Sequence, residues 1–241
     1  AVVVVSTPAV NDNCGVISVL NTYNGTPDAS GIYPVGTTIV IWTVTDVYGN
    51  TNTCAQTITI TDDEDPQIVC APAQSQIADA SQCNADVEIS SPTTSDNCGV
   101  GALINSYNGT ADASDNYPVG TTTIIWTLSD IHGNTSTCAQ AITISDTQVP
   151  MSVCAPDQIQ SSDAGECNAD VEVAGPLTSD NCGVATVINS YNNTADASAN
   201  YPVGTTMVLW TVTDVHGNTS TCVQSITVTD DENPVINCNA D

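Results

Sequence analysis

The chain has 241 residues, with 27 acidic residues, 11 Cys and no Lys or Arg, and 41% of its residues are hydrophobic. This hydrophobic share is enough to form packed cores, which excludes a disordered acidic tail. A formal net charge of −27 without a cationic side chain excludes nucleic acid as a partner. We expect no membrane insertion of this segment either, since no apolar run reaches the roughly 18 residues of a span.

The first element along the chain is Ala1–Val5, a β-branched run that predicts a strand. It is too short, and lacks the basic flank, to be a signal peptide. The motifs D-N-C-G-V and Y-P-V-G-T-T follow at Asp12–Val16 and Tyr33–Thr38. Both return twice at a step of 84 residues, at Asp96–Val100, Asp180–Val184, Tyr117–Thr122 and Tyr201–Thr206. A fixed step indicates one fold used three times.

The clearest strand runs from Thr37 to Thr45, where apolar residues and Thr alternate around Trp42. The 84-residue step carries this tryptophan to Trp126 and Trp210, and we predict that all three lie in a core. The sequence D-V-Y-G-N at Asp46–Asn50 predicts a turn, and a further strand follows it. With no sustained helical period, the chain is predicted to be all-β, built from tandem immunoglobulin-like sandwiches of about seven strands.

The repeat frame predicts four segments. The segment 1–62 is a module that lacks its opening strand, 63–146 and 147–230 are complete modules, and 231–241 begins a further, truncated module.

Four cysteines recur in each full repeat, and sequence alone permits three ways of pairing them. We predict that the D-N-C loop is tied to the strand after the G-N turn, and that a small loop is closed at the start of each module. The predicted pairs are Cys14–Cys54, Cys70–Cys83, Cys98–Cys138, Cys154–Cys167 and Cys182–Cys222, with the partner of Cys238 outside the chain. No C-x-x-C pair favours a zinc site instead. Structural disulfides indicate an extracellular or cell-surface location.

The motif set D-N-C-G, Y-P-V-G-T-T and W-T-V-T-D-V-x-G-N-T, with the cysteine that follows it, resembles the hyalin repeat, or HYR, module over nearly the whole chain. The resemblance implies tandem immunoglobulin-like modules of extracellular adhesion proteins, with no catalytic residues. The chain departs from the family in lacking Lys and Arg. It also departs in carrying Gln56, Gln140 and Gln224 where an aromatic residue is common.

Acidic residues gather at the module junctions, which read T-D-D-E-D-P at Thr61–Pro66 and T-D-D-E-N-P at Thr229–Pro234. Clustered carboxylates suit Ca²⁺, and these junctions resemble the calcium-binding linkers of cadherins. The middle junction, Ser145–Pro150, keeps only Asp146, which argues against metal at every junction. The predicted ligands are Asp62, Asp63, Glu64, Asp65, Asp146, Asp230, Asp231 and Glu232, joined by Asp46 and Asp130 or by Asp96 and Asp180. The alternative is a solvated acidic linker.

Two further residue sets have simple interpretations. His132 and His216 lie in the D-x-H-G-N turns and are interpreted as surface residues, because Tyr48 takes their place in the first repeat. Acceptor patterns for N-glycans occur at Asn24, Asn108, Asn192, Asn134 and Asn218.

These features predict a non-catalytic extracellular stalk or filament whose partners are further repeats or copies of the chain in head-to-tail order. One alternative is an adhesin that binds glycan or protein ligands, with the Tyr-Asn loops at Tyr23, Tyr107 and Tyr191 as the binding surface. Another is an accessory region of a larger secreted enzyme.

Overall fold

The computed structural model describes residues 1–237. The chain divides into two compact units, of which the first comprises residues 1–71, 91–112 and 125–139 and the second the other described residues. Every regular element in the described part is a β-strand, which confirms the predicted all-β fold of tandem immunoglobulin-like sandwiches. Among residues 1–237 there is no helix long and apolar enough to cross a membrane.

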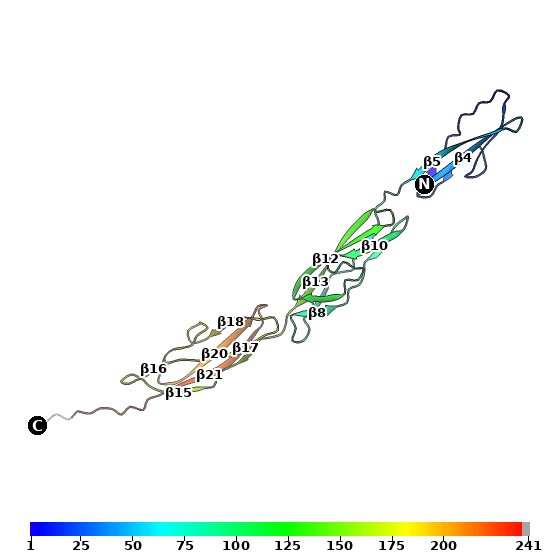
Figure 1. The fold of residues 1–241 in the computed structure, drawn as a ribbon. Helices are drawn as coiled ribbons and strands as arrows, with labels where there is room; N and C mark the ends of the chain where they lie inside the picture. The colour runs from blue at the N-terminus through cyan, green and yellow to red at the C-terminus, as the bar shows by residue number, and fades with distance from the viewer. Residues whose placement is uncertain (238–241) are drawn as a thin grey trace. The chain divides into compact units, whose positions relative to one another are not determined.

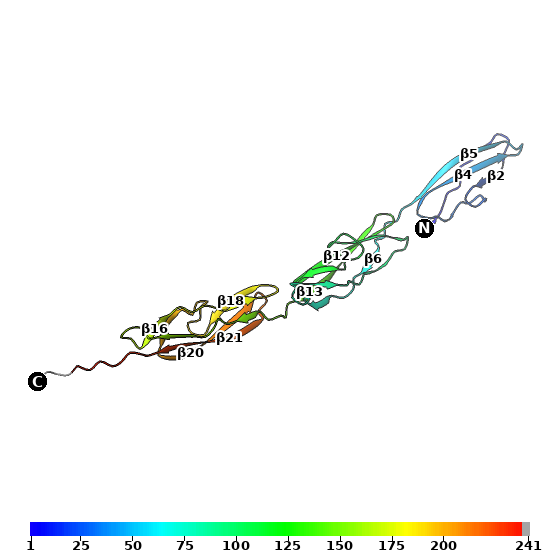
Figure 2. The ribbon, with the colours of Figure 1, turned by 60° about the horizontal axis from the view of Figure 1, so that its bottom comes forward.

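The first repeat has one three-stranded antiparallel sheet and a short strand pair. Its sheet has the order β2-β4-β5, and the three strands lie side by side (Figure 2). The pair joins β1 to β3. The strands are β1 (Val2–Val3), β2 (Val16–Asn21), β3 (Gly31–Ile32), β4 (Gly36–Asp46) and β5 (Thr51–Ile60). The predicted turn at Asp46–Asn50 therefore connects the two long strands.

The second repeat contributes eight strands. In the first unit β6 pairs with β9 and β10 with β12, and in the second unit β8 pairs with β11 and β7 runs parallel to β13. The strands are β6 (Gln67–Val69), β7 (Gln74–Ile77), β8 (Asn84–Val87), β9 (Thr93–Ser95), β10 (Val100–Asn105), β11 (Asp115–Pro118), β12 (Gly120–Asp130) and β13 (Thr135–Ser145).

The third repeat lies wholly in the second unit and follows the same plan. A four-stranded sheet has the order β15-β21-β20-β18, with β20 and β21 as a long hairpin (Figure 1), and the pairs β14–β17 and β16–β19 complete it. The strands are β14 (Met151–Val153), β15 (Gln158–Ser161), β16 (Asn168–Val171), β17 (Leu177–Ser179), β18 (Val184–Asn189), β19 (Ala199–Pro202), β20 (Gly204–Asp214) and β21 (Thr219–Thr229).

The core of the third repeat is built around Trp210, which is fully buried. Alternate residues of β20 point inward, so Val208 and Trp210 lie on the same buried face. The indole Nε1–H donates to the side-chain oxygen of Gln224 at 3.3 Å, and the Gln224 amide donates to the carbonyl of Pro156 at 3.0 Å. The glutamine that replaces the common aromatic residue thus satisfies the buried indole.

The tryptophans of the other repeats are also buried. Trp42 is 2% exposed and Trp126 is fully buried. Trp42 repeats the hydrogen bond to its glutamine, donating to Gln56 at 3.0 Å. A cavity of about 220 Å³ opens beside Trp42 and is also lined by Val44 and Cys54.

The predicted cysteine pairing is wrong. The structure pairs Cys70 with Cys138 and Cys154 with Cys222, each over 68 residues, and Cys83 with Cys182 over 99 residues. None of the predicted pairs 14–54, 70–83, 98–138, 154–167 and 182–222 forms among the described residues.

Strand register is the physical reason for the difference. A disulfide needs Cα atoms within about 7 Å of each other. Cys222 stands opposite Trp210 in the β20–β21 ladder, and Cys154, which follows β14, packs against the same core with a Cα–Cα distance of 5.7 Å. The first type of disulfide therefore closes over the tryptophan.

The remaining described cysteines are free thiols. Cys14, Cys54 and Cys167 are exposed, and Cys98 is half-buried. Cys238, whose partner was predicted outside the chain, lies outside the described residues.

Candidate metal centre

A tight turn after β12 presents the first acidic side chain of the centre. One oxygen of Asp130 accepts hydrogen bonds from the backbone N–H groups of His132, Gly133 and Asn134. The other accepts from the Asn134 side chain at 2.6 Å. Gly133, with φ of 99°, permits the turn. Burial raises the pKa of Asp130, but these hydrogen bonds outweigh it and hold the pKa below its ordinary value, so the carboxylate is ionised.

The D-N-C loop presents the second acid. The Oδ1 atom of Asp96 accepts the backbone N–H groups of Cys98 at 2.9 Å and Gly99 at 2.8 Å. Its Oδ2 atom is buried and has no hydrogen-bond partner. A buried carboxylate oxygen without a partner is costly, because its desolvation is not compensated. The loop is thus shaped to hold an oxygen that nothing in the described chain satisfies.

The third acid, Asp62, comes from the segment after β5. Its side chain is only 3% exposed, and its Oδ2 lies 3.1 Å from Nδ1 of His132. The Asn134 amide also donates to the backbone oxygen of Asp62 at 3.2 Å. The turn after β12 therefore holds Asp62 through both side chain and main chain.

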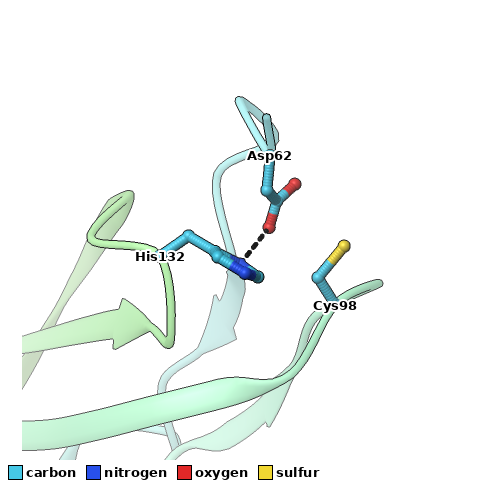
Figure 3. A group of neighbouring side chains, drawn as sticks. All are labelled: Asp62, Cys98 and His132. Atoms are coloured by element: carbon cyan, nitrogen blue, oxygen red, sulfur yellow. Dashed lines mark hydrogen bonds and ion pairs between the residues drawn. The ribbon is translucent and has the colours of Figure 1, made fainter. Parts of the chain in front are cut away.

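Ligand atoms from these three segments converge. Asp62, Asp96 and Asp130 place one oxygen each within 4.8 Å of one another, and Asp62, Cys98 and His132 do the same with oxygen, sulfur and nitrogen. Figure 3 shows the second group, with the Cys98 sulfur and the His132 ring both turned toward the Asp62 carboxylate. Because the chain has no Lys or Arg, no cationic side chain other than a protonated histidine can neutralise this centre.

The second unit repeats the arrangement 84 residues further on. Asp146, Asp180 and Asp214 lie within 4.8 Å of one another through their oxygens, and His216 Nδ1 lies 3.2 Å from Asp146, whose side chain is fully buried. The Oδ1 atom of Asp180 is buried without a partner, as its counterpart Asp96 Oδ2 is. The junction that the sequence disfavoured therefore has the same geometry as the acid-rich one.

The predicted calcium ligands fall into two groups. Asp62 and Asp146 belong to the clusters, together with the turn and loop aspartates Asp130, Asp96 and Asp180. The others are exposed and stand outside the clusters found among the described residues: Asp63, Glu64, Asp65, Asp230, Asp231 and Glu232.

Several of the exposed acids hold loops instead. Glu64 accepts from the Asn97 side chain at 2.7 Å, and Glu232 accepts from the backbone N–H of Gly165 at 3.0 Å. Asp46 closes the turn of the first repeat with Asn50, in the manner of Asp130. These acids are structural in the described part of the chain.

The two cysteines beside the clusters differ in state. Cys98 is a free thiol whose pKa is raised by burial and by the neighbouring Asp62, so the thiol is protonated when no cation is bound. Its counterpart Cys182 is bonded to Cys83.

Sequence reasoning missed both histidines and the third aspartate of the second cluster. His132 and His216 each bond the junction aspartate of their own unit, so they are more than surface turn residues. Asp214 occupies the turn position of Asp130. The signal was present in the 84-residue frame, because the junction, loop and turn aspartates keep their positions in both clusters.

The asparagines of the glycan acceptor patterns all use their side chains. Asn24 and Asn192 organise their own loops, for example by donating to the carbonyls of Asp28 and Asp196. Asn134 and Asn218 brace the two clusters. Glycosylation at Asn24, Asn108, Asn192, Asn134 and Asn218 stays a prediction.

The tyrosines of the Tyr-Asn loops support buried neighbours. Tyr191 stacks on Tyr201 with ring centroids 4.2 Å apart and donates to the carbonyl of Asn200. Tyr23 stacks on Tyr33 in the same way. One face of each ring is thereby covered, and ligand binding at these loops stays a prediction.

Comparison with known families places the fold. The family model for the HYR domain matches residues 61–144 and 145–228. The chain belongs to the HYR-domain family. Residues 61 and 145, where the two matches begin, are adjacent to the junction aspartates Asp62 and Asp146, so the cluster lies where one HYR domain follows another.

Curated relatives of this HYR chain include two proteins named hyalin. The chain is 29% identical to hyalin of Strongylocentrotus purpuratus over 98% of its own length and 20% of that protein. It is 32% identical to hyalin of Lytechinus variegatus over 80% of its length and 36% of that protein. It also matches the Rattus norvegicus "Sushi, von Willebrand factor type A, EGF and pentraxin domain-containing protein 1", at 31% over 69% of the chain and 4% of that protein. The chain thus spans a minor part of each relative.

Among solved structures, the protocadherin gamma B2 extracellular cadherin domains 1–5 align with a TM-score of 0.37. The identity is 13%, over 95% of this chain and 56% of that one. With these relatives, the HYR chain is an extracellular or cell-surface module of structural or adhesive type.

Proposed function

We propose that this chain is a non-catalytic module array of an extracellular stalk or filament, in which Ca²⁺ bound at the junctions stiffens the link between successive repeats. The observation that carries the proposal is the repeated cluster of three aspartates, Asp62 with Asp96 and Asp130 and its equivalent 84 residues on. The predicted module boundaries, 1–62, 63–146, 147–230 and 231–241, are part of this proposal.

The ligand chemistry supports calcium. Ca²⁺ is a hard cation that takes six to eight oxygen ligands, and carboxylates are its usual partners in proteins. Each cluster brings together three carboxylates from three chain segments: the junction, the D-N-C loop and the turn. A cation held by all three would join the junction segment to two loops of the repeat that follows. The partnerless oxygens of Asp96 and Asp180 would gain a partner.

Calcium should therefore raise the melting temperature. A cation that binds only the folded state at a concentration one hundredfold above its Kd stabilises by about 2.7 kcal/mol per site. The sharp variant is Asp96→Asn with Asp180→Asn, because the asparagine oxygen can keep the loop hydrogen bonds while the second oxygen is lost. We expect calorimetry to show a calcium-dependent rise in Tm that a chelator reverses and that this double variant lacks.

The matched control is Asp63→Asn, which removes a negative charge from an exposed acid outside the clusters. It should keep the full calcium response. Equal melting curves in calcium and in chelator for the unmodified chain would refute the calcium proposal, as would an equal response in the double variant.

Equivalent cysteines support assembly of copies in head-to-tail order. In the 84-residue frame Cys238 occupies the position of Cys154, and Cys54 occupies that of Cys222. Cys167 and Cys14 similarly occupy the positions of Cys83 and Cys182. If the end of one copy docks on the first repeat of the next, both types of disulfide can form between copies. The cavity beside Trp42 and Cys54 would receive the docking segment.

Oxidised, purified chain should therefore form a ladder of covalent oligomers that collapses on reduction. Mass spectrometry should find Cys238 linked to Cys54 and Cys167 linked to Cys14. The double variant Cys54→Ser with Cys167→Ser should give no ladder, because it breaks both bonds of the contact. Cys98→Ser, whose partner position falls outside this scheme, should leave the ladder unchanged; random cross-links that include Cys98 would argue against ordered assembly.

A further inference from the structure

Each aspartate cluster has a cysteine and a histidine within reach, and this pair is not needed to bind calcium. Asp62, Cys98 and His132 offer oxygen, sulfur and nitrogen atoms that lie within 4.8 Å of one another. The equivalent set in the second unit is Asp146, Cys182 and His216. The two sets differ in one respect, since Cys98 is a free thiol while Cys182 is in a disulfide.

The ligand types point to a different metal class. Thiolate, imidazole and carboxylate are the ligands of Zn²⁺ and related borderline cations, whereas Ca²⁺ takes oxygen. A disulfide sulfur carries no negative charge and is not a thiolate ligand. The set around Cys98 therefore suits zinc, and the set around Cys182 does so only when its disulfide is absent.

The geometry around Cys98 is close to that of a bound site. Two ligands at zinc distances in a tetrahedral arrangement lie about 3.3 Å apart. The Asp62 oxygen and His132 nitrogen are separated by 3.1 Å. Asp62 is held from behind by Asn134, and the His132 backbone is held by Asp130, so both side chains are oriented by hydrogen bonds of their own. The partnerless Oδ2 of Asp96, in the same loop as Cys98, is available as a fourth ligand.

We propose that Asp62, Cys98 and His132 form a site for Zn²⁺ or a cation of the same class, and that the Cys83–Cys182 disulfide keeps the equivalent junction an oxygen-only site. On binding, the Cys98 thiol releases its proton to solvent and its sulfur bonds the metal as a thiolate. The state of one cysteine thus selects the cation at each junction. This inference refines the proposed cation function, because both metals would share Asp62 or Asp146.

Cobalt(II) is the probe of choice, because a thiolate–cobalt bond gives a charge-transfer absorption that oxygen ligands do not. The parent protein carries Cys14, Cys54, Cys167 and Cys238 as Ser, which leaves Cys98 as its free thiol. We expect one equivalent of Co²⁺ to give the band and Zn²⁺ to remove it. Cys98→Ser should abolish the band, and His132→Gln should weaken Co²⁺ binding at least tenfold.

The second arm frees the other cysteine. Adding Cys83→Ser to the parent releases the Cys182 thiol and should double the thiolate-bound Co²⁺ from one equivalent to two. Adding Cys83→Ser and Cys182→Ser together should leave one equivalent. If Cys83→Ser folds poorly, alkylation of the unmodified chain answers instead: Zn²⁺ should slow alkylation of Cys98 while Cys54 and Cys167 react at unchanged rates.

The inference is overturned if the parent gives no thiolate band, if the band survives Cys98→Ser, or if Zn²⁺ protects all thiols equally. Its failure is distinguishable from failure of the calcium proposal, because the calcium response is measured by melting of Asp96→Asn with Asp180→Asn. A calcium response without a thiolate band would leave the calcium function standing alone.

Discussion

Replacing Trp210 by alanine is expected to lower the free energy of unfolding of the third repeat by about 3–5 kcal/mol, the usual range for deleting a large buried aromatic side chain. The indole is fully buried between the sheet and the facing strands, and the disulfide Cys154–Cys222 packs against it. The substitution opens a cavity and also leaves the buried Gln224 oxygen without its donor. Urea denaturation followed by circular dichroism measures the change.

Two companion variants separate the causes. Trp210→Phe keeps most of the volume but removes the Nε1–H donor, so it should cost less than alanine while leaving Gln224 unsatisfied. Leu177→Ala truncates a side chain that is 76% exposed and should change stability by less than about 0.5 kcal/mol. A Trp210→Ala protein as stable as Leu177→Ala would show that the indole is not the centre of the core.

Removing the disulfide between Cys154 and Cys222 by alanine substitution at both positions should cost about 4 kcal/mol. The bond closes a loop with a sequence separation of 68, and the chain-entropy model gives that magnitude for a loop of this length. The unfolded state gains the freedom that the crosslink had removed. Thermal and urea unfolding of the unmodified and doubly substituted chains measure the difference.

Cys167→Ala tests the pairing itself. The sequence-based pairing joined Cys154 to Cys167, whereas the structure leaves Cys167 exposed and free. We therefore expect Cys167→Ala to be nearly neutral for stability in the isolated chain. A loss comparable to that of the double substitution at Cys154 and Cys222 would restore the pairing that the structure rejects.

Much of the fold could be predicted because it follows from local pattern. The alternation around Trp42 predicted β4, and the G-N turn predicted where β5 begins. The 84-residue step then extended each prediction to the other repeats. Disulfide pairing resisted prediction because it depends on which strands are neighbours in the sandwich. Cys83 meets Cys182 across 99 residues, and no spacing rule within one repeat indicates that.

The site was predicted in kind but not in detail. Charge density drew attention to the run Asp62–Asp65, yet only Asp62 of that run enters a cluster. Neighbouring residues along an extended segment point in different directions, so a run of acids cannot all face one cation. Asp146 has few acidic neighbours and still forms the same cluster, because its partners come from the D-N-C loop and the turn.

The three disulfides overlap along the chain, and this has a topological consequence. The spans 70–138, 83–182 and 154–222 together cover every peptide bond from Cys70 to Cys222. A protease that cuts once anywhere in that stretch opens a loop but releases no fragment, because at least one crosslink bridges the cut. Outside the cell, where proteases act on exposed loops and no machinery replaces a severed strand, a nicked chain of this kind would still carry tension from end to end of that stretch.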